Sequence, residues 1–251
     1  MRAIPNDALL DPVAAYDRVA PAYSRLAERR KAYLAAVDRI IGEEIPPGSR
    51  SMLDVGAGNG SRAQRIALGA GLRDLVLLEP SAAMRNRCPA EATLWAMRAE
   101  ELSRQQSRFD VITCLWNVLG HIFPSGARAE ALRQFARLIS PSGRIFIDVN
   151  HRYNARHYGV WITAARFFRD RFRWTGHSGD VTITWNIEGH CCSTMGHVFT
   201  HKEFASLARA AGLSVEKRFV VDYATGQRRR WSVDGNLLYE LRAPDQAVRS
   251  G

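Results

Sequence analysis

The sequence predicts an α/β fold with a doubly wound, mostly parallel sheet of seven strands and an antiparallel insertion after the fifth strand. Up to residue 149, short apolar runs alternate with helical patterns, which is typical of parallel β-α-β units. Residues 181–187 then alternate apolar and polar side chains, which indicates antiparallel strands. A chain of 251 residues, 46% of them hydrophobic, can bury one sizeable core around such a sheet.

The N-terminal part of the chain is predicted to be helical. A short helix that begins at Pro12 is expected to break at Pro21. A longer amphipathic helix is expected over residues 26–41. We therefore divide the chain into an N-terminal helical cover, residues 1–48, and a domain built on the sheet, residues 49–251.

A glycine-rich stretch, Leu-Asp-Val-Gly-Ala-Gly-Asn-Gly at residues 53–60, joins the first predicted strand to a helix that starts at Ser61. Glycines let a ligand approach bare backbone, and the helix start adds free N–H donors and the positive end of its dipole. The spacing is G-x-G-x-G, so Ser61 replaces the third glycine of a dinucleotide-binding motif. A second strand, residues 74–78, delivers Glu79, whose carboxylate is placed to accept from both hydroxyls of a ribose.

The remaining elements are predicted from apolar runs and from the glycines, prolines and capping residues between them. Ser81 can cap the second crossover helix, and Thr200 with Glu203 forms a capping box. The insertion, residues 155–197, is interpreted as a lid that shapes the substrate site. The expected elements are strands 93–97, 109–115 and 144–149, helices 128–138 and 201–211, and a final strand pair, 213–221 and 232–241, at the sheet edge.

The acid before the glycines, the glycine turn and Glu79 together resemble the S-adenosylmethionine pocket of the class I methyltransferases, whose fold is Rossmann-like. The pattern Tyr-Asp-x-x-Ala-x-x-Tyr, from Tyr16 to Tyr23, is similar to the N-terminal segment that many of these enzymes fold over the cofactor; a surface helix is the alternative. Arg98 stands where the family often carries an aspartate. The resemblance implies that S-adenosylmethionine, with S-adenosylhomocysteine as its product, is bound by Tyr16, Tyr23, Asp54, Gly56, Ala57, Gly58, Gly60, Glu79, Pro80, Ala99, Glu100 and Leu115.

A second block, residues 114–122, resembles the glycine and sarcosine N-methyltransferases, in which Cys-Leu-x-Asn precedes a histidine four residues later. The resemblance implies that Asn117 and His121 are catalytic, with His121 as the base or as the group that orients the acceptor. A purely structural histidine is an equal alternative for His121, as it is for His151 and His197. The residues implied to contact the substrate are Trp116, Asn117, Arg152 and Tyr153, although Arg152 lies two positions later than the family's arginine.

The charge of the chain leaves more than one function open. The net charge of +10 comes mostly from arginines spread along the chain, with one run at residues 228–230. This leaves open an RNA methyltransferase that uses its arginine-rich surface, and also a non-catalytic member of the fold that binds the cofactor. The leading interpretation is transfer of a methyl group to a small polar metabolite, at nitrogen rather than at oxygen.

The sequence shows neither a targeting signal nor a metal-binding pattern. The sequence has no secretory signal and no apolar run of bilayer length, so we expect a cytoplasmic protein without a membrane partner. The four cysteines, two of them adjacent, match neither a disulfide framework nor a zinc spacing. No metal is expected, because Asp148 and Asn150 are not adjacent as in the metal-binding Asp-Asn pair of the catechol methyltransferases. The oligomeric state stays open.

Overall fold

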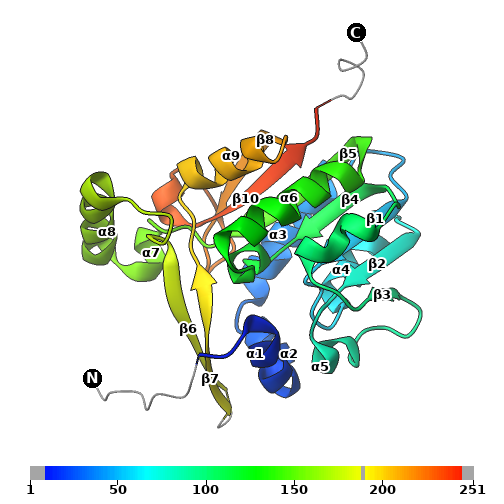
Figure 1. Ribbon diagram of the computed structural model, residues 1–251, viewed down its shortest axis with the longest axis horizontal. Coiled ribbons are helices and arrows are strands. Elements are labelled where there is room, and N and C mark those ends of the chain that lie inside the picture. Colours follow the sequence, from blue (N-terminus) through cyan, green and yellow to red (C-terminus); the bar gives the residue numbers. More distant parts are fainter. Residues whose placement is uncertain (1–8, 188–189, 245–251) are drawn as a thin grey trace.

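A single large sheet organises the molecule. The computed structural model describes residues 9–187 and 190–244, and within them eight strands pair in the order β3-β2-β1-β4-β5-β10-β8-β9 (Figure 1). Neighbours among β1 to β5 are parallel, whereas β10 is antiparallel to both β5 and β8. The strands are β1 (Ser51–Val55), β2 (Asp74–Leu78), β3 (Thr93–Trp95), β4 (Phe109–Cys114), β5 (Ile139–Val149), β8 (Ser214–Val221), β9 (Arg228–Arg229) and β10 (Asn236–Arg242).

The predicted mostly parallel, doubly wound sheet is therefore confirmed, and the two-residue strand β9 adds one strand to the expected seven. Strand β5 begins at Ile139, five residues earlier than expected. Proline lacks an N–H for the ladder, so Pro141 argued against a strand there. The structure accommodates Pro141 because the pairing of β5 with β4 passes from Ile139 directly to Arg144, which leaves residues 140–143 without partners on β4.

Helices cover both faces of the sheet (Figure 1). On one face lie α3 (Lys31–Glu44) and α4 (Ser61–Gly69), and on the other α6 (Ser125–Leu138) and α9 (His201–Ala210). Successive strand residues point to opposite faces. This alternation sends Met52 into the core beside α3 and its neighbour Leu53 into the core beside α6.

The region proposed as the N-terminal cover, residues 1–48, contains α1 (Pro12–Val19), a 3₁₀ turn (Ala20–Ala22) and α2 (Tyr23–Glu28), and it also contains α3. The predicted break at Pro21 is confirmed by that turn. The single helix expected over 26–41 is wrong, because the chain bends after Glu28 and α3 starts afresh at Lys31. α2 has no buried residue that would hold it in line with α3.

Two predicted caps are present at the starts of later helices. The Ser81 hydroxyl accepts from the Met84 N–H at the start of α5 (Ala82–Arg85). Thr200 and Glu203 form the predicted capping box of α9. Both caps satisfy N–H groups that have no partner inside their helix.

The insertion contains α7 (Ala155–Tyr158), α8 (Val160–Arg173) and a hairpin of β6 (Asp180–Ile187) and β7 (His190–His197). The hairpin agrees with the predicted antiparallel strands, whereas α8 was not predicted. The Leu10 N–H donates to the Ser193 carbonyl at 2.9 Å, and α1 packs against β7. The insertion and the N-terminal cover therefore meet on the same side of the molecule.

Candidate active site

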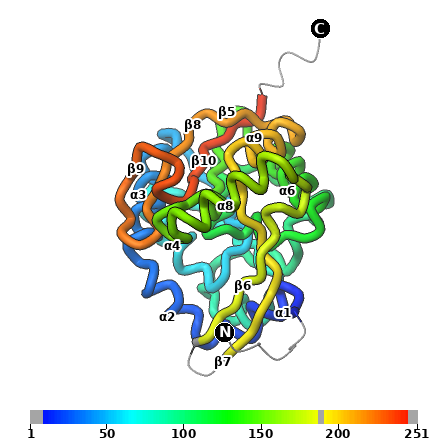
Figure 2. The backbone as a smooth tube through the Cα atoms, turned by 90° about the vertical axis from the view of Figure 1, so that its left-hand side faces the viewer, coloured from blue at the N-terminus to red at the C-terminus, as the bar shows by residue number. Residues whose placement is uncertain are grey.

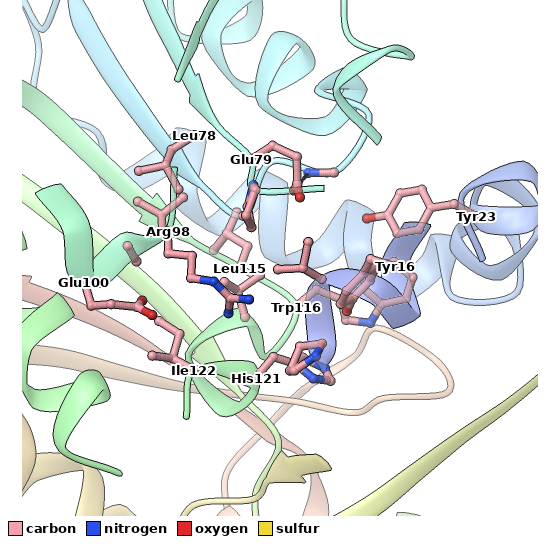
Figure 3. Close-up of a pocket in the computed structure, with 18 residues that line it drawn as sticks. Tyr16, Tyr23, Leu78, Glu79, Arg98, Glu100, Leu115, Trp116, His121 and Ile122 are labelled. Atoms are coloured by element: carbon pink, nitrogen blue, oxygen red, sulfur yellow. Dashed lines mark hydrogen bonds between the residues drawn. The ribbon is translucent and has the colours of Figure 1, made fainter. Parts of the chain in front are cut away.

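A cavity of about 740 Å³, measured with its open mouth, lies beyond the C-terminal ends of β1, β2 and β4 (Figure 3). Doubly wound sheets bind ligands at this edge. Helix α1 and the first residue of α2 close over it. The cavity is lined by Pro12, Val13, Tyr16, Tyr23, Val55, Gly56, Gly58, Leu78, Glu79, Pro80, Arg98, Ala99, Glu100, Leu115, Trp116, Val118, His121 and Ile122.

The glycine turn after β1 forms one wall of the cavity. Gly56 and Gly58 have φ angles of +70° and +59°, a region that residues with a side chain rarely adopt. A Cβ on Gly56 would lie 2.5 Å from Val118 Cγ1, and a Cβ on Gly58 would lie 3.0 Å from Tyr23 Oη. The N–H of Gly56 donates to the Leu78 carbonyl at 2.8 Å, which fastens the turn to β2. Glycine is therefore required by both conformation and space.

Glu79 follows β2 and lines the cavity beside the glycine turn (Figure 3). Its Oε2 accepts from the Gly58 N–H at 2.7 Å, and its Oε1 accepts from the Ser81 N–H at 2.8 Å. Burial raises the pKa of Glu79 to about 7, against the opposing effect of these two N–H donors. The carboxylate thus stands in the cavity with acceptor capacity beyond its two backbone partners.

His121 lines the far end of the cavity, in a 3₁₀ turn (Val118–His121) after β4. Its Nδ1 is buried and has no hydrogen-bond partner among the described residues. Burial lowers the pKa of His121 to about 4, and the Met195 backbone only partly opposes this shift. The ring meets Tyr16 edge-on at 5.5 Å and lies 6.0 Å from Trp185 of β6. The cavity is therefore lined by a neutral imidazole, whose Nδ1 has no hydrogen-bond partner among the described residues and is covered by protein atoms.

Aromatic side chains from α2 and from the loop after β4 also line the cavity. The rings of Tyr23 and Trp116 lie 5.8 Å apart, and both line the cavity (Figure 3). Trp116 Nε1 donates to Tyr223 Oη at 3.2 Å. Trp116 and Asn117 have φ angles of +57° and +61°, an uncommon conformation that places the Trp116 ring beside the cavity.

Asn117 does not line the cavity, although the sequence implied a catalytic part for it. Its Nδ2 donates to the His197 carbonyl at 3.2 Å, and its Oδ1 accepts from the Asn150 N–H at 2.9 Å. Its own N–H donates to Asp148 Oδ1 at 3.0 Å. The side chain therefore joins the ends of β4, β5 and β7, and the structure gives Asn117 a positioning part in place of direct contact.

Arg152 and Tyr153 lie outside the cavity as well, which corrects their expected place in the substrate site. Arg152 is 1% exposed and forms a two-point ion pair with Asp170 of α8, with Nε–Oδ2 and Nη2–Oδ1 distances of 2.5 and 2.9 Å. The Tyr153 hydroxyl donates to the same Asp170 Oδ2 at 2.9 Å. The charge of Arg152 is thus already neutralised by Asp170, and neither residue is among those that line the cavity.

Three residues expected at the cofactor, Asp54, Ala57 and Gly60, support the glycine turn without lining the cavity. Asp54 Oδ1 accepts from Thr113 Oγ1 at 2.5 Å, and burial raises the pKa of Asp54 to about 6. The Ala57 N–H donates to the Leu78 carbonyl at 3.1 Å. A Cβ on Gly60 would lie 2.6 Å from Leu77 Cδ1, so Gly60 permits close packing of the turn.

The other two candidate histidines have structural partners. The buried His197 ring lies between Asp180 Oδ1 at 2.6 Å and Glu203 Oε1 at 2.8 Å. His151 Nδ1 lies 2.8 Å from the Ser232 carbonyl. Of the three histidines, His121 is the one that lines the cavity.

Sequence reasoning missed several residues of the cavity wall. Pro12 and Val13 lie one helical turn before Tyr16 on α1, so their spacing could have identified them. Arg98 was seen only as a departure from the family pattern, yet it lines the cavity and donates to Asp11 Oδ1 at 2.8 Å. The other missed residues are Val55, Leu78, Val118 and Ile122.

The described ranges, 9–187 and 190–244, contain no group of three or more His, Cys, Asp or Glu side chains that could hold a metal ion. No helix in these ranges combines the length and the apolar character that a bilayer crossing requires.

Comparison with known proteins agrees with this geometry. A family model described as "Methyltransferase domain" matches residues 25–218, which is more than half of the chain. No curated protein matches this chain in sequence.

Solved structures share the fold. The CcbJ methyltransferase from Streptomyces caelestis superposes with a TM-score of 0.66 at 15% identity, over 91% of this chain and 97% of that one. The sugar N-methyltransferase KedS8 from Streptoalloteichus gives 0.59 at 18% identity, over 97% and 98%. The S-adenosylmethionine-bound amino pentose methyltransferase CalS10 from Micromonospora echinaspora gives 0.57 at 17% identity, over 88% and 97%. At these identities the likeness concerns the fold alone.

Proposed function

This chain belongs to the class I S-adenosylmethionine-dependent methyltransferases, and we propose that it methylates a small polar metabolite at a nitrogen atom. One observation carries the proposal: a single cavity is lined by a bare glycine turn, by the buried carboxylate of Glu79 and by the neutral imidazole of His121. The first two suit a nucleoside, and the third suits an acceptor with an N–H or O–H group. The cavity also has an apolar and aromatic lining, as small-molecule sites do.

The residues that line the cavity offer the hydrogen-bonding groups and the packing surfaces that S-adenosylmethionine needs. Glu79 would accept from the ribose hydroxyls, and Pro80, Ala99 and Glu100 would border the adenine. The Leu115 carbonyl would accept from the methionyl amine. Tyr16 and Tyr23 would close over the cofactor from the N-terminal cover, and the support for this assignment is that both line the cavity.

When bound, the sulfonium of S-adenosylmethionine supplies an electrophilic methyl group. The protein's main contribution is then to hold the acceptor in line, which can supply about 7–11 kcal/mol in favourable cases. Because its pKa lies near 4, the His121 imidazole is neutral at pH 7, and a neutral imidazole has one nitrogen that can accept a hydrogen bond from the acceptor. Asn117 would act indirectly, by holding the turn that carries His121.

The low pKa of His121 favours nitrogen over oxygen as the accepting atom. An amine that arrives unprotonated needs only orientation, whereas a hydroxyl needs a base to remove its proton. An imidazole with a pKa near 4 is a poor base for that purpose. A sugar N-methyltransferase and an amino pentose methyltransferase are among the proteins that share this fold, so the fold is compatible with such substrates.

The proposal is tested by transfer of a radiolabelled methyl group from S-adenosylmethionine to panels of small amines, amino sugars and amino acids, and to their hydroxyl analogues. We expect product from at least one amine and none from its hydroxyl analogue. Turnover of hydroxyl compounds alone would contradict the choice of nitrogen.

The same assay distinguishes the proposed function from two other candidate functions. An RNA methyltransferase would label RNA and would lose RNA affinity steeply between low and moderate salt. A non-catalytic member would bind S-adenosylmethionine, seen as a rise in Tm, and label no acceptor. The neutral imidazole of His121, which lines the same cavity as Glu79, favours transfer over binding alone.

His121→Ala is expected to lower kcat for the best amine by about 10–100-fold, because the acceptor loses its orienting hydrogen bond. The Kd of S-adenosylmethionine should change by less than about twofold, since only the acceptor end of the cavity is altered. Initial-rate kinetics and calorimetry measure the two quantities. The exposed His177 provides the control, because His177→Asn should leave kcat unchanged. An unaltered kcat in His121→Ala would remove His121 from the mechanism.

Cofactor affinity is expected to rise with pH between 6 and 8. The pKa of Glu79 is raised to about 7, and ribose hydroxyls donate best to the ionised carboxylate, so binding favours proton loss. At pH 6 about one tenth of Glu79 is ionised, which makes the Kd about tenfold weaker than at pH 8. Calorimetry at several pH values measures this dependence, and Glu79→Gln should abolish it. An equally steep pH dependence in Glu79→Gln would assign the effect to another group.

A further inference from the structure

Helix α8 turns its apolar side away from the protein. Trp161, Phe168 and Phe172 are 87%, 63% and 80% exposed and, at helical spacing, form one outer line that we call the aromatic stripe. The inner side of the helix is polar, with Thr163 and Asp170 buried. A surface helix normally has the opposite arrangement, with its apolar stripe toward the core.

The ion pair between Asp170 and Arg152 fixes this orientation. Both side chains are buried, and the Tyr153 hydroxyl also donates to Asp170. Rotating the helix to bury the aromatic stripe would pull Asp170 out of its pair and leave the Arg152 charge without its partner. The outward direction of the stripe is therefore a stable feature of the fold.

Arginines border the aromatic stripe on both sides. At 100° per residue, Arg169 and Arg173 fall on one flank and Arg171 on the other, and all three are exposed. The helix carries one acid, Asp170, which is buried on the inner side. An apolar line between two cationic flanks is complementary to a surface that is apolar inside and anionic at its boundary.

The same face continues beyond α8. The turn η4 (Ser232–Asp234) packs against α7, and α7 packs against α8. Trp231, which precedes η4, is 63% exposed, with the Arg230 guanidinium 5.1 Å from its ring centre. Figure 2 shows α8 and β9 on the same side of the molecule. A second exposed pair of tryptophan and arginine thus lies next to η4, which α7 connects to α8.

We propose that α8 docks the protein on an anionic lipid surface, lying flat with the aromatic stripe at the boundary between headgroups and acyl chains. The exposed arginines would contact lipid phosphates, and the net charge of +10 would add long-range attraction. The proposal departs from the expectation that the protein has no membrane partner, because a helix that lies in the interface plane needs no segment of bilayer length. This inference does not depend on the proposed substrate.

Two other occupants fit the surface less well. A second copy of the chain would bring arginine flanks against arginine flanks, with no exposed acid on either α8 to pair with them. RNA would stack on aromatic rings, but the exposed Val160 and Ile162 beside the stripe offer no ring to a base. The mixture of aliphatic, aromatic and arginine side chains suits lipid best.

Vesicle flotation tests the proposal. We expect the full chain to float with phosphatidylcholine vesicles that contain about 30% phosphatidylglycerol, and not with pure phosphatidylcholine. W161S/F168S/F172S should reduce the bound fraction at least about tenfold, and R169Q/R171Q/R173Q should remove most of its salt dependence. Leu68→Ser on α4 is the control, because Leu68 is 73% exposed on another helix and should bind as the wild type does. The cofactor-induced rise in Tm, unchanged in each variant, shows that the fold is retained.

Three outcomes would overturn the proposal. The first is a wild-type chain that fails to float with the anionic vesicles, or a stripe variant that floats as well as the wild type. The second is a dimer in light scattering that the stripe variant converts to a monomer, which would assign α8 to a second copy. The third is an RNA oligonucleotide that binds the wild type and loses affinity in the stripe variant.

Discussion

Glu79→Ala is expected to weaken S-adenosylmethionine binding at least about tenfold. Hydrogen bonds to a charged group contribute about 1.5–3 kcal/mol, and each 1.4 kcal/mol corresponds to a factor of ten in Kd. Glu79 also organises the cavity wall, because its two oxygens accept from the Gly58 and Ser81 N–H groups. The alanine variant therefore loses both the ribose contact and the partner of the glycine turn. Calorimetric titration with S-adenosylmethionine and S-adenosylhomocysteine measures the effect.

Asp74→Ala provides the matched control for Glu79→Ala. Asp74 is an exposed acid at the opposite end of the same strand, so its removal changes the net charge equally but leaves the cavity intact. Its Kd for the cofactor should equal that of the wild type. If Glu79→Ala also binds at near-wild-type affinity, the ribose assignment fails, and with it the cofactor orientation used here.

Arg152→Ala is expected to destabilise the fold by about 3 kcal/mol, because it leaves the Asp170 carboxylate buried without its cation. For a chain of this size that loss corresponds to a fall in Tm of roughly 6–12 °C. The cofactor affinity of the remaining folded protein should stay near the wild-type value, since Arg152 does not line the cavity. Thermal unfolding and calorimetry below the transition measure the two quantities.

Two further variants distinguish a structural Arg152 from a substrate-binding one. Arg169→Ala removes an exposed arginine 3.6 Å from the same Asp170 and should change Tm little. Arg152→Ala/Asp170→Ala should recover part of the lost stability, because no unpaired charge then stays buried. A raised KM for the acceptor with an unchanged Tm in Arg152→Ala would restore the substrate-binding role.

The cofactor half of the site could be predicted because its residues belong to local motifs. Gly56 and Gly58 lie in one turn between a strand and a helix, and Glu79 directly follows the neighbouring strand. In a parallel sheet these strand ends meet at the same edge, so the motif alone predicts that they face one cavity. The structure places all three there.

The acceptor half could not be predicted in the same way. Arg152 looked available because its partner, Asp170, lies on a helix whose apolar residues face outward and which therefore gave no sign of a buried face. A family resemblance implied that Asn117 is catalytic. The backbone groups that hydrogen-bond to its side chain come from β7 and from the end of β5, far along the chain. Local patterns carry no information about such distant partners.

The sequence by itself determined the parallel sheet, the glycine turn and the acid at the end of β2, because hydrophobic period and turn chemistry act over a few neighbouring residues. Only the tertiary structure decided which polar groups stay available. His197 is held between two carboxylates, whereas His121 lines the cavity and its Nδ1 has no hydrogen-bond partner among the described residues. The two histidines differ because folding brings charged partners from distant segments to the His197 ring, whereas it surrounds the His121 ring with apolar and aromatic neighbours.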